Sequence, residues 1–196
     1  KTLKATLRPY QVKGLDWLWF LNRYGLGGVL ADDMGLGKTV QALAVLLKSK
    51  KAEGKKPSLV VVPASVVMNW CEESARFAPS LSVLDLTGPG RSEKFDKIAN
   101  NDLVVTNYAL LRRDIERLGE TEFRYVILDE AQNIKNPDAV VTKAALSLQA
   151  RHRLALTGTP LENRALDLWS ILSFVNPGYL GSRSKFVARY DRPEAP

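Results

Sequence analysis

The sequence predicts an α/β fold in which a mostly parallel sheet is covered by helices on both faces, and three observations lead to this prediction. Short apolar runs alternate with segments of helical periodicity along the chain, as in strands joined through crossover helices. A glycine-rich stretch at residues 32–39 separates an apolar run from a helical pattern, and the apolar run at residues 124–128 ends in two adjacent acids. Both features fall where strands end, which is where ligands of such sheets bind.

The alternation of patterns locates the individual elements. Strands are expected near residues 28–31, 58–62, 81–86, 103–106, 124–128 and 153–156. Helices are expected near residues 9–24, 38–50, 66–77, 92–99, 108–118, 139–149 and 164–175. Residues 48–56 contain five lysines in nine positions and are expected to form a solvated loop, which serves either solubility or contact with DNA. The chain after Gly178 is expected to be irregular.

Composition limits the class of protein. A length of 196 residues suggests one domain, residues 1–196, and 45% hydrophobic content is ample for one core. No apolar stretch reaches the roughly 18 to 20 residues that cross a bilayer, and no leader pattern is present, so an intracellular protein is expected, cytoplasmic (nucleoid) in a prokaryote and nuclear in a eukaryote. The single Cys71 and single His152 indicate neither an internal disulfide nor a zinc site. The net charge of +7 favours a polyanionic partner such as nucleic acid.

The glycine-rich stretch has the form of a phosphate-binding loop. Its glycines let backbone N–H groups close around phosphate oxygens, and the following helix adds positive potential at its N-terminus. Lys38 is then expected to reach the β and γ phosphates, and the Thr39 hydroxyl to bind Mg²⁺. The usual pattern has glycine where this chain has Asp32, and the alternative for the whole stretch is an ordinary helix cap. The predicted nucleotide-binding residues here are Asp33, Met34, Gly35, Leu36, Gly37, Lys38 and Thr39.

The two acids after the strand at residues 124–128 complete a candidate catalytic site with Lys38. Asp129 is assigned to the metal, through a water, and Glu130 to polarising the attacking water. The alternative for an isolated Asp-Glu pair is a helix N-cap with a solvated neighbour. The presence of the phosphate-binding loop in the same chain favours the catalytic interpretation.

Other strand ends also carry polar groups. Thr157, Gly158 and Thr159 follow one predicted strand and are expected beside the phosphate site. Hydroxyl and amide groups that could bind a phosphate backbone follow two more strands, at Pro63, Ser65, Thr106 and Asn107. For Ser65 and Asn107 taken singly, helix capping is the stronger explanation. Gln11, at the start of the first helix, could bind the edge of an adenine through its side-chain amide.

The order of these motifs resembles helicase superfamily two, and within it the Swi/Snf-type double-stranded DNA translocases. The resemblance rests on residues 7–11, 32–39, 62–65, 105–108, 129–137 and 156–163, and it continues through residues 167–181. The family commonly has histidine where this chain has Gln132, which puts the contact from that residue in doubt without implying loss of activity.

The resemblance implies a RecA-like P-loop fold and a motor of two lobes, with ATP between them and duplex DNA across both. This chain has the motifs of the first lobe and none of the second, whose arginine fingers complete the catalytic site. By likeness, Gln11 reads adenine, residues 157–159 couple nucleotide to DNA, and DNA contacts come from Pro63, Ser65, Thr106, Asn107 and Lys135. The implied function is ATP-dependent translocation on double-stranded DNA that remodels protein–DNA complexes, with ATP and Mg²⁺ as cofactors. The implied partners are duplex DNA, the second lobe and DNA-bound proteins, with no membrane partner.

Two alternatives remain open. One is another superfamily-two motor, an RNA helicase or the translocating subunit of a restriction enzyme, against which residues 133–137 and 169–181 argue. The other is a non-catalytic module that docks DNA or a partner, against which intact Lys38, Asp129 and Glu130 argue.

Overall fold

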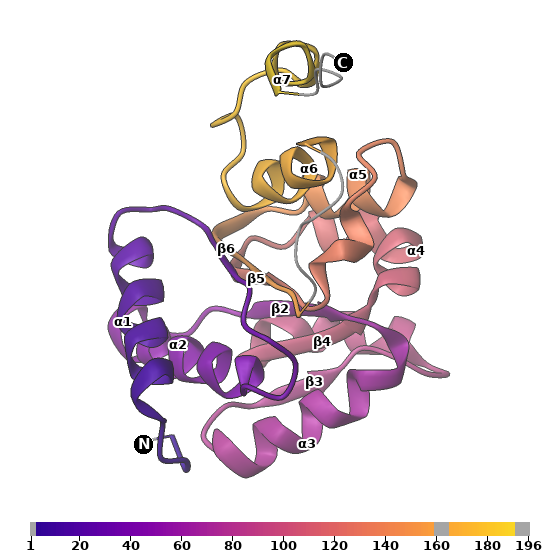
Figure 1. Ribbon diagram of the computed structural model, residues 1–196. Coiled ribbons are helices and arrows are strands. Elements are labelled where there is room, and N and C mark those ends of the chain that lie inside the picture. Colours follow the sequence, from indigo (N-terminus) through magenta and orange to yellow (C-terminus); the bar gives the residue numbers. More distant parts are fainter. Residues whose placement is uncertain (1–2, 159–164, 191–196) are drawn as a thin grey trace.

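A single six-stranded sheet forms the centre of the molecule in the computed structural model, which describes residues 3–158 and 165–190 (Figure 1). The strand order is β1-β6-β5-β2-β4-β3, and every pairing is parallel, so the expected mostly parallel sheet is confirmed. The strands are β1 (Gly28–Leu30), β2 (Ser58–Val62), β3 (Val83–Asp85), β4 (Leu103–Asn107), β5 (Phe123–Leu128) and β6 (Ala150–Leu156).

Helices cover both faces of this sheet, as the sequence predicts. One face packs against α1 (Pro9–Arg23), α2 (Lys38–Glu53) and α3 (Val67–Phe77), and the other against α4 (Tyr108–Gly119), α5 (Val140–Ser147) and α6 (Ala165–Val175). Three 3-10 helices, η1 (Ala64–Val66), η2 (Arg91–Asn100) and η3 (Ala131–Ile134), lie in the connections. The last described helix, α7 (Arg183–Tyr190), lies beyond α6 at the top of Figure 1. No described helix is long and apolar enough to cross a membrane.

Strand β2 shows why the apolar runs form central strands. Its side chains alternate between the two cores: Leu59 and Val61 pack with the α4–α6 face, and Val60 and Val62 with the α1–α3 face. All four are fully buried, so the run needs no polar alternation. Burial of each such side chain is worth about 1.5 to 3 kcal/mol.

The helix expected near residues 92–99 is present, as part of the 3-10 helix η2. Two other expectations are wrong, namely a loop at residues 48–56 and an irregular chain after Gly178. Residues 48–53 are not a loop, because α2 continues to Glu53 and ends at Gly54, whose φ of 81° is a conformation that favours glycine. The last turns of α2 are tied down by Lys50, whose ammonium donates to Asp102 at 2.8 Å and to the Ser80 carbonyl at 2.9 Å.

The chain after Gly178 is also more regular than expected. It forms α7, which buries Phe186 and is joined to the loop before α5 by an ion pair of 2.7 Å between Arg183 and Asp138. This ion pair links residues 45 positions apart, which local sequence patterns do not show.

The register of the parallel strands brings the motif-bearing loops together. Leu30 pairs with Leu156, and Leu128 pairs with Ala155, so β1, β5 and β6 end at nearly the same level. The segments that follow these three strands, from residues 31, 129 and 157, therefore emerge side by side at one edge of the sheet.

Candidate functional site

A cleft of about 430 Å³ opens at this carboxyl edge of the sheet, between the start of α2 and the end of β5. It brings together most of the residues that the sequence assigns to nucleotide and metal. Those lining it are Met34, Gly35, Gly37, Lys38, Thr39, Asp129 and Glu130, together with Val40, Asn69, Glu73 and Phe77.

The phosphate-binding loop needs glycine at two positions. Gly35 and Gly37 have φ angles of 80° and 79°, in the left-handed region that other residues rarely adopt. At Gly37 a Cβ atom would also lie 2.5 Å from the Gln11 amide nitrogen, too close for any contact. Lys38 is the first residue of α2, so the loop delivers its backbone to a helix N-terminus, which favours an anion.

The Lys38 ammonium is folded back over the loop. It donates to the backbone carbonyls of Asp32 at 2.7 Å and Asp33 at 3.1 Å. On its other side lies Gly158 at the end of β6, where a Cβ atom would be 3.4 Å from the Lys38 nitrogen. The ammonium thus lies between the loop and β6, within the cleft that the sequence assigns to phosphate.

Asp32, the departure from the usual glycine, has a structural role. Its carboxylate accepts a hydrogen bond of 3.0 Å from the side-chain amide of Gln41, which is fully buried on α2. The side chain at this position therefore ties the start of the loop to the helix that follows it.

Both carboxylate oxygens of Asp129 are hydrogen-bonded. Oδ2 accepts from the indole Nε1 of Trp70 at 2.7 Å, and Oδ1 accepts from the backbone nitrogen of Glu130 at 3.0 Å. Burial raises the pKa of the Asp129 carboxyl above its usual range, and the hydrogen bond from Trp70 opposes that shift. The carboxylate faces the cleft in a fixed orientation, as a metal ligand requires.

Glu130 has an unusual backbone conformation. Its φ of 51° and ψ of 57° are left-handed, and among the described residues no other non-glycine residue has a positive φ. Its Oε2 accepts from the amide of Gln132 at 2.8 Å, and Gln132 Oε1 in turn accepts from the Thr157 hydroxyl at 3.0 Å. Thr157, the first of the residues predicted to couple nucleotide to DNA, is thus joined to Glu130 through Gln132.

Gln11 lies beside the phosphate-binding loop, but its amide is engaged within the chain. Nε2 donates to the Leu36 carbonyl at 2.9 Å, and Oε1 accepts from the backbone nitrogen of Arg8 at 2.8 Å. The Tyr10 hydroxyl donates to the same Leu36 carbonyl at 3.0 Å, so α1 holds the loop through two side chains. The contact of Gln11 with adenine stays a prediction.

The residues predicted to contact DNA lie outside the cleft. Pro63 and the exposed Ser65 follow β2, and Ser65 lies within η1, whose cap carries no side-chain hydrogen bond. Asn107 caps α4 by accepting from the Leu110 nitrogen at 3.0 Å, so the capping interpretation is confirmed for it. Thr106 is 1% exposed, so its side chain does not reach the surface.

The remaining predicted residues are more scattered. Lys135 is exposed and lines a separate hollow of about 500 Å³ with Asp138 and Arg183. Thr157 and Gly158 lie at the end of β6, whereas Thr159 lies outside the described residues.

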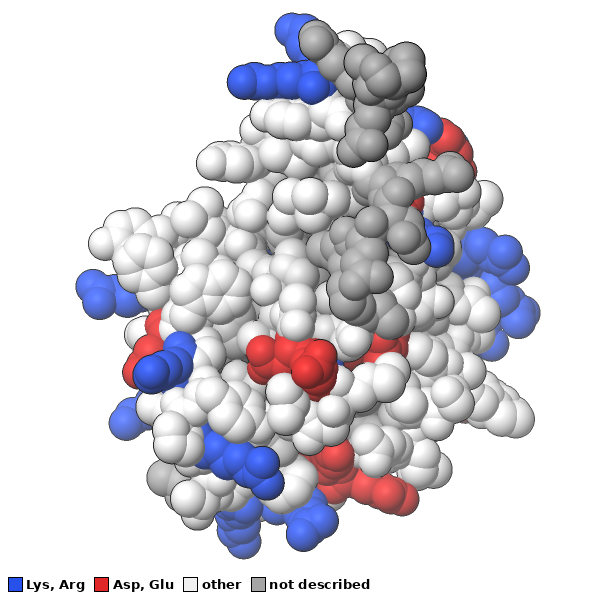
Figure 2. All heavy atoms as spheres, in the orientation of Figure 1, with Lys and Arg blue, Asp and Glu red and all other residues white. Residues whose placement is uncertain are grey.

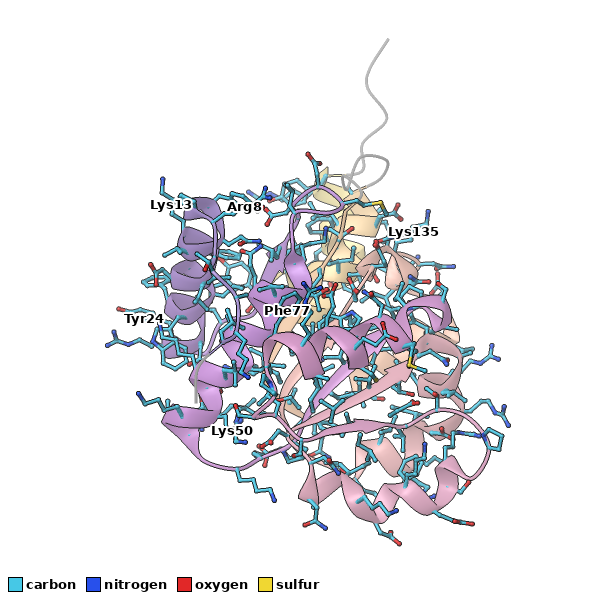
Figure 3. All side chains as sticks on the ribbon, turned by 90° about the horizontal axis from the view of Figure 1, so that it is seen from below. Arg8, Lys13, Tyr24, Lys50, Phe77 and Lys135 are labelled. Atoms are coloured by element: carbon cyan, nitrogen blue, oxygen red, sulfur yellow. The ribbon has the colours of Figure 1, made fainter. Side chains whose placement is uncertain are left out.

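Sequence reasoning missed the contribution of α3. Asn69, Glu73 and Phe77 line the cleft, and Figure 3 shows Phe77 toward the middle of the molecule, whereas Lys13 and Tyr24 project outward from α1. Asn69, Glu73 and Phe77 are four residues apart in the sequence, which places them on one helix face, and this spacing could have indicated a shared role. Trp70 gave no such signal, because its partner Asp129 is 59 positions away.

The charged side chains are unevenly distributed over the surface. Figure 2 shows acidic side chains near the centre of one face and Lys and Arg mostly around its periphery. On this face a polyanion would meet positive charge at the margin and not at the centre.

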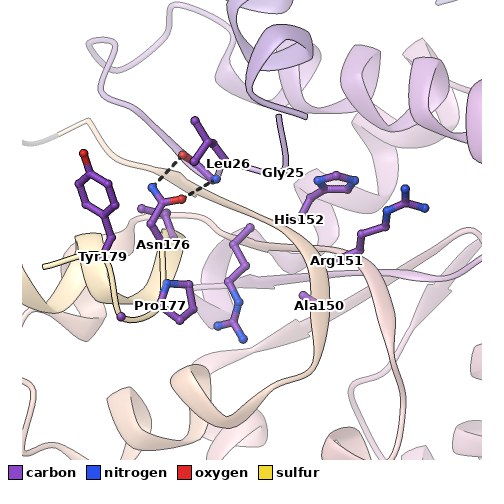
Figure 4. Close-up of a pocket in the computed structure, with 12 residues that line it drawn as sticks. Gly25, Leu26, Ala150, Arg151, His152, Asn176, Pro177 and Tyr179 are labelled. Atoms are coloured by element: carbon purple, nitrogen blue, oxygen red, sulfur yellow. Dashed lines mark hydrogen bonds between the residues drawn. The ribbon is translucent and has the colours of Figure 1, made fainter. Parts of the chain in front are cut away.

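A second cleft, of about 500 Å³, lies at the opposite, amino-terminal ends of β1 and β6 (Figure 4). Among the predicted site residues that the structure describes, none lines it. The Asn176 side chain at its wall exchanges two hydrogen bonds with the Gly27 backbone, at 2.8 and 3.1 Å, and so joins the end of α6 to the start of β1.

Comparison with known proteins agrees with this architecture. The sequence profile of the SNF2-related domain matches residues 10–195. The solved structure of the Sulfolobus solfataricus SWI2/SNF2 ATPase core in complex with dsDNA is 50% identical with a TM-score of 0.90, and the match covers 96% of this chain and 39% of that one.

Two curated relatives are similar over nearly the whole chain. YwqA of Bacillus subtilis is 47% identical over 196 residues, covering 98% of this chain and 21% of YwqA. The TATA-binding protein-associated factor MOT1 of Saccharomyces cerevisiae is 40% identical over 207 residues, covering 98% of this chain and 11% of MOT1. The chain thus spans about a fifth of the length of YwqA and about a tenth of the length of MOT1.

Proposed function

The chain belongs to the SNF2-related domain family, and from this premise we propose that it is the ATP-binding lobe of a DNA-dependent ATPase that translocates on duplex DNA and remodels protein–DNA complexes. The observation that carries the proposal is the single cleft in which Lys38, Thr39, Asp129 and Glu130 meet. The names of the relatives support it: the Sulfolobus structure is an ATPase core in complex with dsDNA, the name of YwqA describes an ATP-dependent helicase or translocase, and MOT1 is a TATA-binding protein-associated factor.

Binding of the triphosphate falls to the loop and to Lys38. Backbone N–H groups of the loop and of the first turn of α2 donate to phosphate oxygens, and the Lys38 ammonium exchanges its two carbonyl acceptors for the β and γ phosphates. Charge-assisted contacts of this kind are the stronger class of hydrogen bond, so the exchange favours the nucleotide.

The donor set fits Mg²⁺. The Thr39 hydroxyl and the Asp129 carboxylate line the same cleft and offer the hard oxygen ligands that this ion prefers. Among the described residues no three His, Cys, Asp or Glu side chains form a metal-holding group, which agrees with an ion bound by few protein oxygens and completed by phosphates and water. The ion would neutralise charge on the β and γ oxygens during transfer.

Glu130 acts on the attacking water. Its carboxylate would accept a hydrogen bond and then a proton from a water in line with the γ-phosphate. The water oxygen bonds to phosphorus as the bond from phosphorus to the ADP oxygen breaks, and the proton passes from Glu130 to the released phosphate, giving ADP and phosphate. Gln132 holds one oxygen of this carboxylate and leaves the other for the water. A second RecA-like lobe would supply arginine fingers and, with this lobe, the surface for duplex DNA.

Substitution of Lys38 tests the phosphate site. Lys38→Ala removes a charge-assisted contact worth about 1.5 to 3 kcal/mol, so affinity for Mg·ADP in titration calorimetry should fall about ten- to a hundredfold. Lys51→Ala is the matched control, because exposed Lys51 lies on the same helix near its opposite end. Equal affinities of the two variants would contradict the assignment of the loop.

A comparison of nucleic acids tests the motor class. Phosphate release by the full-length protein should be stimulated by duplex DNA and not by RNA. Stimulation by RNA alone would favour the RNA-helicase alternative, and nucleotide binding without turnover would favour a docking module.

A further inference from the structure

The Asp129 carboxylate is oriented by a residue outside the motifs of the phosphate site. Trp70, in the first half of α3, donates to its Oδ2 at 2.7 Å. A carboxylate oxygen has two lone pairs, so this contact leaves acceptor capacity for a metal ion or its water. The backbone nitrogen of Glu130 holds the other oxygen, and the two donors together fix the plane of the carboxylate.

Trp70 is itself held rigidly. Its side chain is 1% exposed and packs in the core between α2, α3 and the sheet. An indole N–H is a donor only, and a buried donor requires a partner. Here the acceptor is the carboxylate of a residue that lines the cleft.

Tyr108 holds the same residue from the other side. Its hydroxyl, on a side chain 8% exposed at the start of α4, donates to the backbone carbonyl of Asp129 at 2.7 Å. Trp70 and Tyr108 come from helices on opposite faces of the sheet, and their hydrogen bonds converge on one residue at the end of β5.

We propose that Trp70 and Tyr108 are positioning residues that hold Asp129 in the orientation in which it binds the metal of Mg·ATP. This inference rests on the proposed function, because it assigns them a role only if Asp129 is a metal ligand. A positioning role differs from a purely structural one in its effect on binding. Deleting either donor should change the contribution of the metal to nucleotide affinity and leave the contribution of the phosphate loop unchanged.

The test is calorimetric titration of the full-length protein with ADP, with Mg²⁺ and with EDTA. The quantity compared is the affinity for ADP with Mg²⁺ divided by the affinity for ADP with EDTA. A general loss of packing would lower both affinities and leave this ratio unchanged. In Trp70→Phe the ratio should fall about tenfold, as on loss of other groups that orient metal ligands, with affinity for metal-free ADP unchanged. Trp17→Phe is the matched control, because the Trp17 side chain is 42% exposed on α1.

A folded Trp70→Phe variant with the wild-type ratio overturns the proposal. If Trp70→Phe does not fold, Tyr108→Phe provides the test, because this substitution deletes one oxygen atom and keeps the ring. An unchanged affinity ratio in Tyr108→Phe overturns the proposal, and a lowered ratio supports it. Tyr24→Phe, at a side chain 67% exposed, is its control. Failure of the wild-type protein to bind ADP more tightly with Mg²⁺ would instead contradict the proposed metal site.

Discussion

The side-chain oxygen of Gln132 accepts a hydrogen bond from the hydroxyl of Thr157, 3.0 Å away, and so connects the end of β5 to the end of β6. Through its nitrogen the same amide holds Glu130. An amide can make both contacts at once because it carries a donor and an acceptor.

Replacement of Gln132 should therefore uncouple the two strand ends. Gln132→Leu replaces the amide by an apolar side chain one atom shorter and removes both hydrogen bonds, each worth about 0.5 to 3 kcal/mol, so DNA-stimulated phosphate release should fall about tenfold. ADP affinity should stay at the wild-type value, because the phosphate loop is untouched. Gln149→Leu is the control, since the exposed Gln149 side chain donates to the Gly119 carbonyl on the surface, away from the cleft. An unchanged rate would show that the contact has no part in turnover.

Glu130→Gln should separate binding from chemistry. The substitution keeps the shape of the side chain but removes the carboxylate that acts on water, so the steady-state rate should fall about 10²- to 10⁴-fold while ATP affinity is nearly intact. Glu116→Gln, at an exposed position on α4, should have the wild-type rate. Retention of most of the DNA-stimulated rate by Glu130→Gln would rule out the role given to this residue.

The lobe on its own should be almost inactive. A phosphoryl-transfer site without its arginine finger loses about 10³ to 10⁵ in rate, so residues 1–196 alone should hydrolyse ATP barely above background even with duplex DNA. Their DNA affinity should be weak and should fall with salt, with a slope of about −0.9 per phosphate neutralised in the logarithmic plot. Phosphate release and DNA affinity should be compared with those of the full-length protein. Robust DNA-stimulated hydrolysis by the lobe alone would contradict the two-lobe account.

Asp102 should make stability depend on pH. Burial opposes its charge, but hydrogen bonds from Lys50 and Ser82 more than offset this, and the pKa of the carboxyl is lowered. A depressed pKa in the folded state stabilises the protein above the unfolded value of about 3.9, and this contribution is lost as pH falls through the folded value.

Asp102→Asn should therefore lower the free energy of unfolding by about 1 to 3 kcal/mol at neutral pH, and the difference from wild type should narrow below about pH 4. Urea unfolding of both proteins at several pH values measures this difference in the free energy of unfolding. Asp96→Asn, at an exposed position on η2, is the control. A constant difference at all pH values would mean that the Asp102 charge is not the cause.

The sequence was sufficient for the sheet because its signals are local. Runs such as Leu59–Val62 are typical of central strands buried on both sides, and the left-handed positions of the loop are occupied by glycines that adopt this conformation without strain. The bonds that orient the site are not local. Trp70 and Tyr108 lie 59 and 21 positions before Asp129, and only packing of α3 and α4 on the sheet brings them to it. Helix α7 was not predicted for the same reason, because its ion pair and the burial of Phe186 depend on residues distant in the sequence.

The left-handed backbone conformation of Glu130 lowers the stability of the fold at a residue whose side chain is assigned to catalysis. Most L-residues pay about 1 to 2 kcal/mol in this conformation, which achiral glycine adopts freely and asparagine and aspartate tolerate. Glycine or asparagine would relieve the strain without supplying a carboxylate, and aspartate would hold its carboxylate one carbon closer to the backbone. A search for thermostable variants of this lobe that scores folding alone would therefore tend to select position 130 and recover well-folded proteins that bind ATP and do not hydrolyse it.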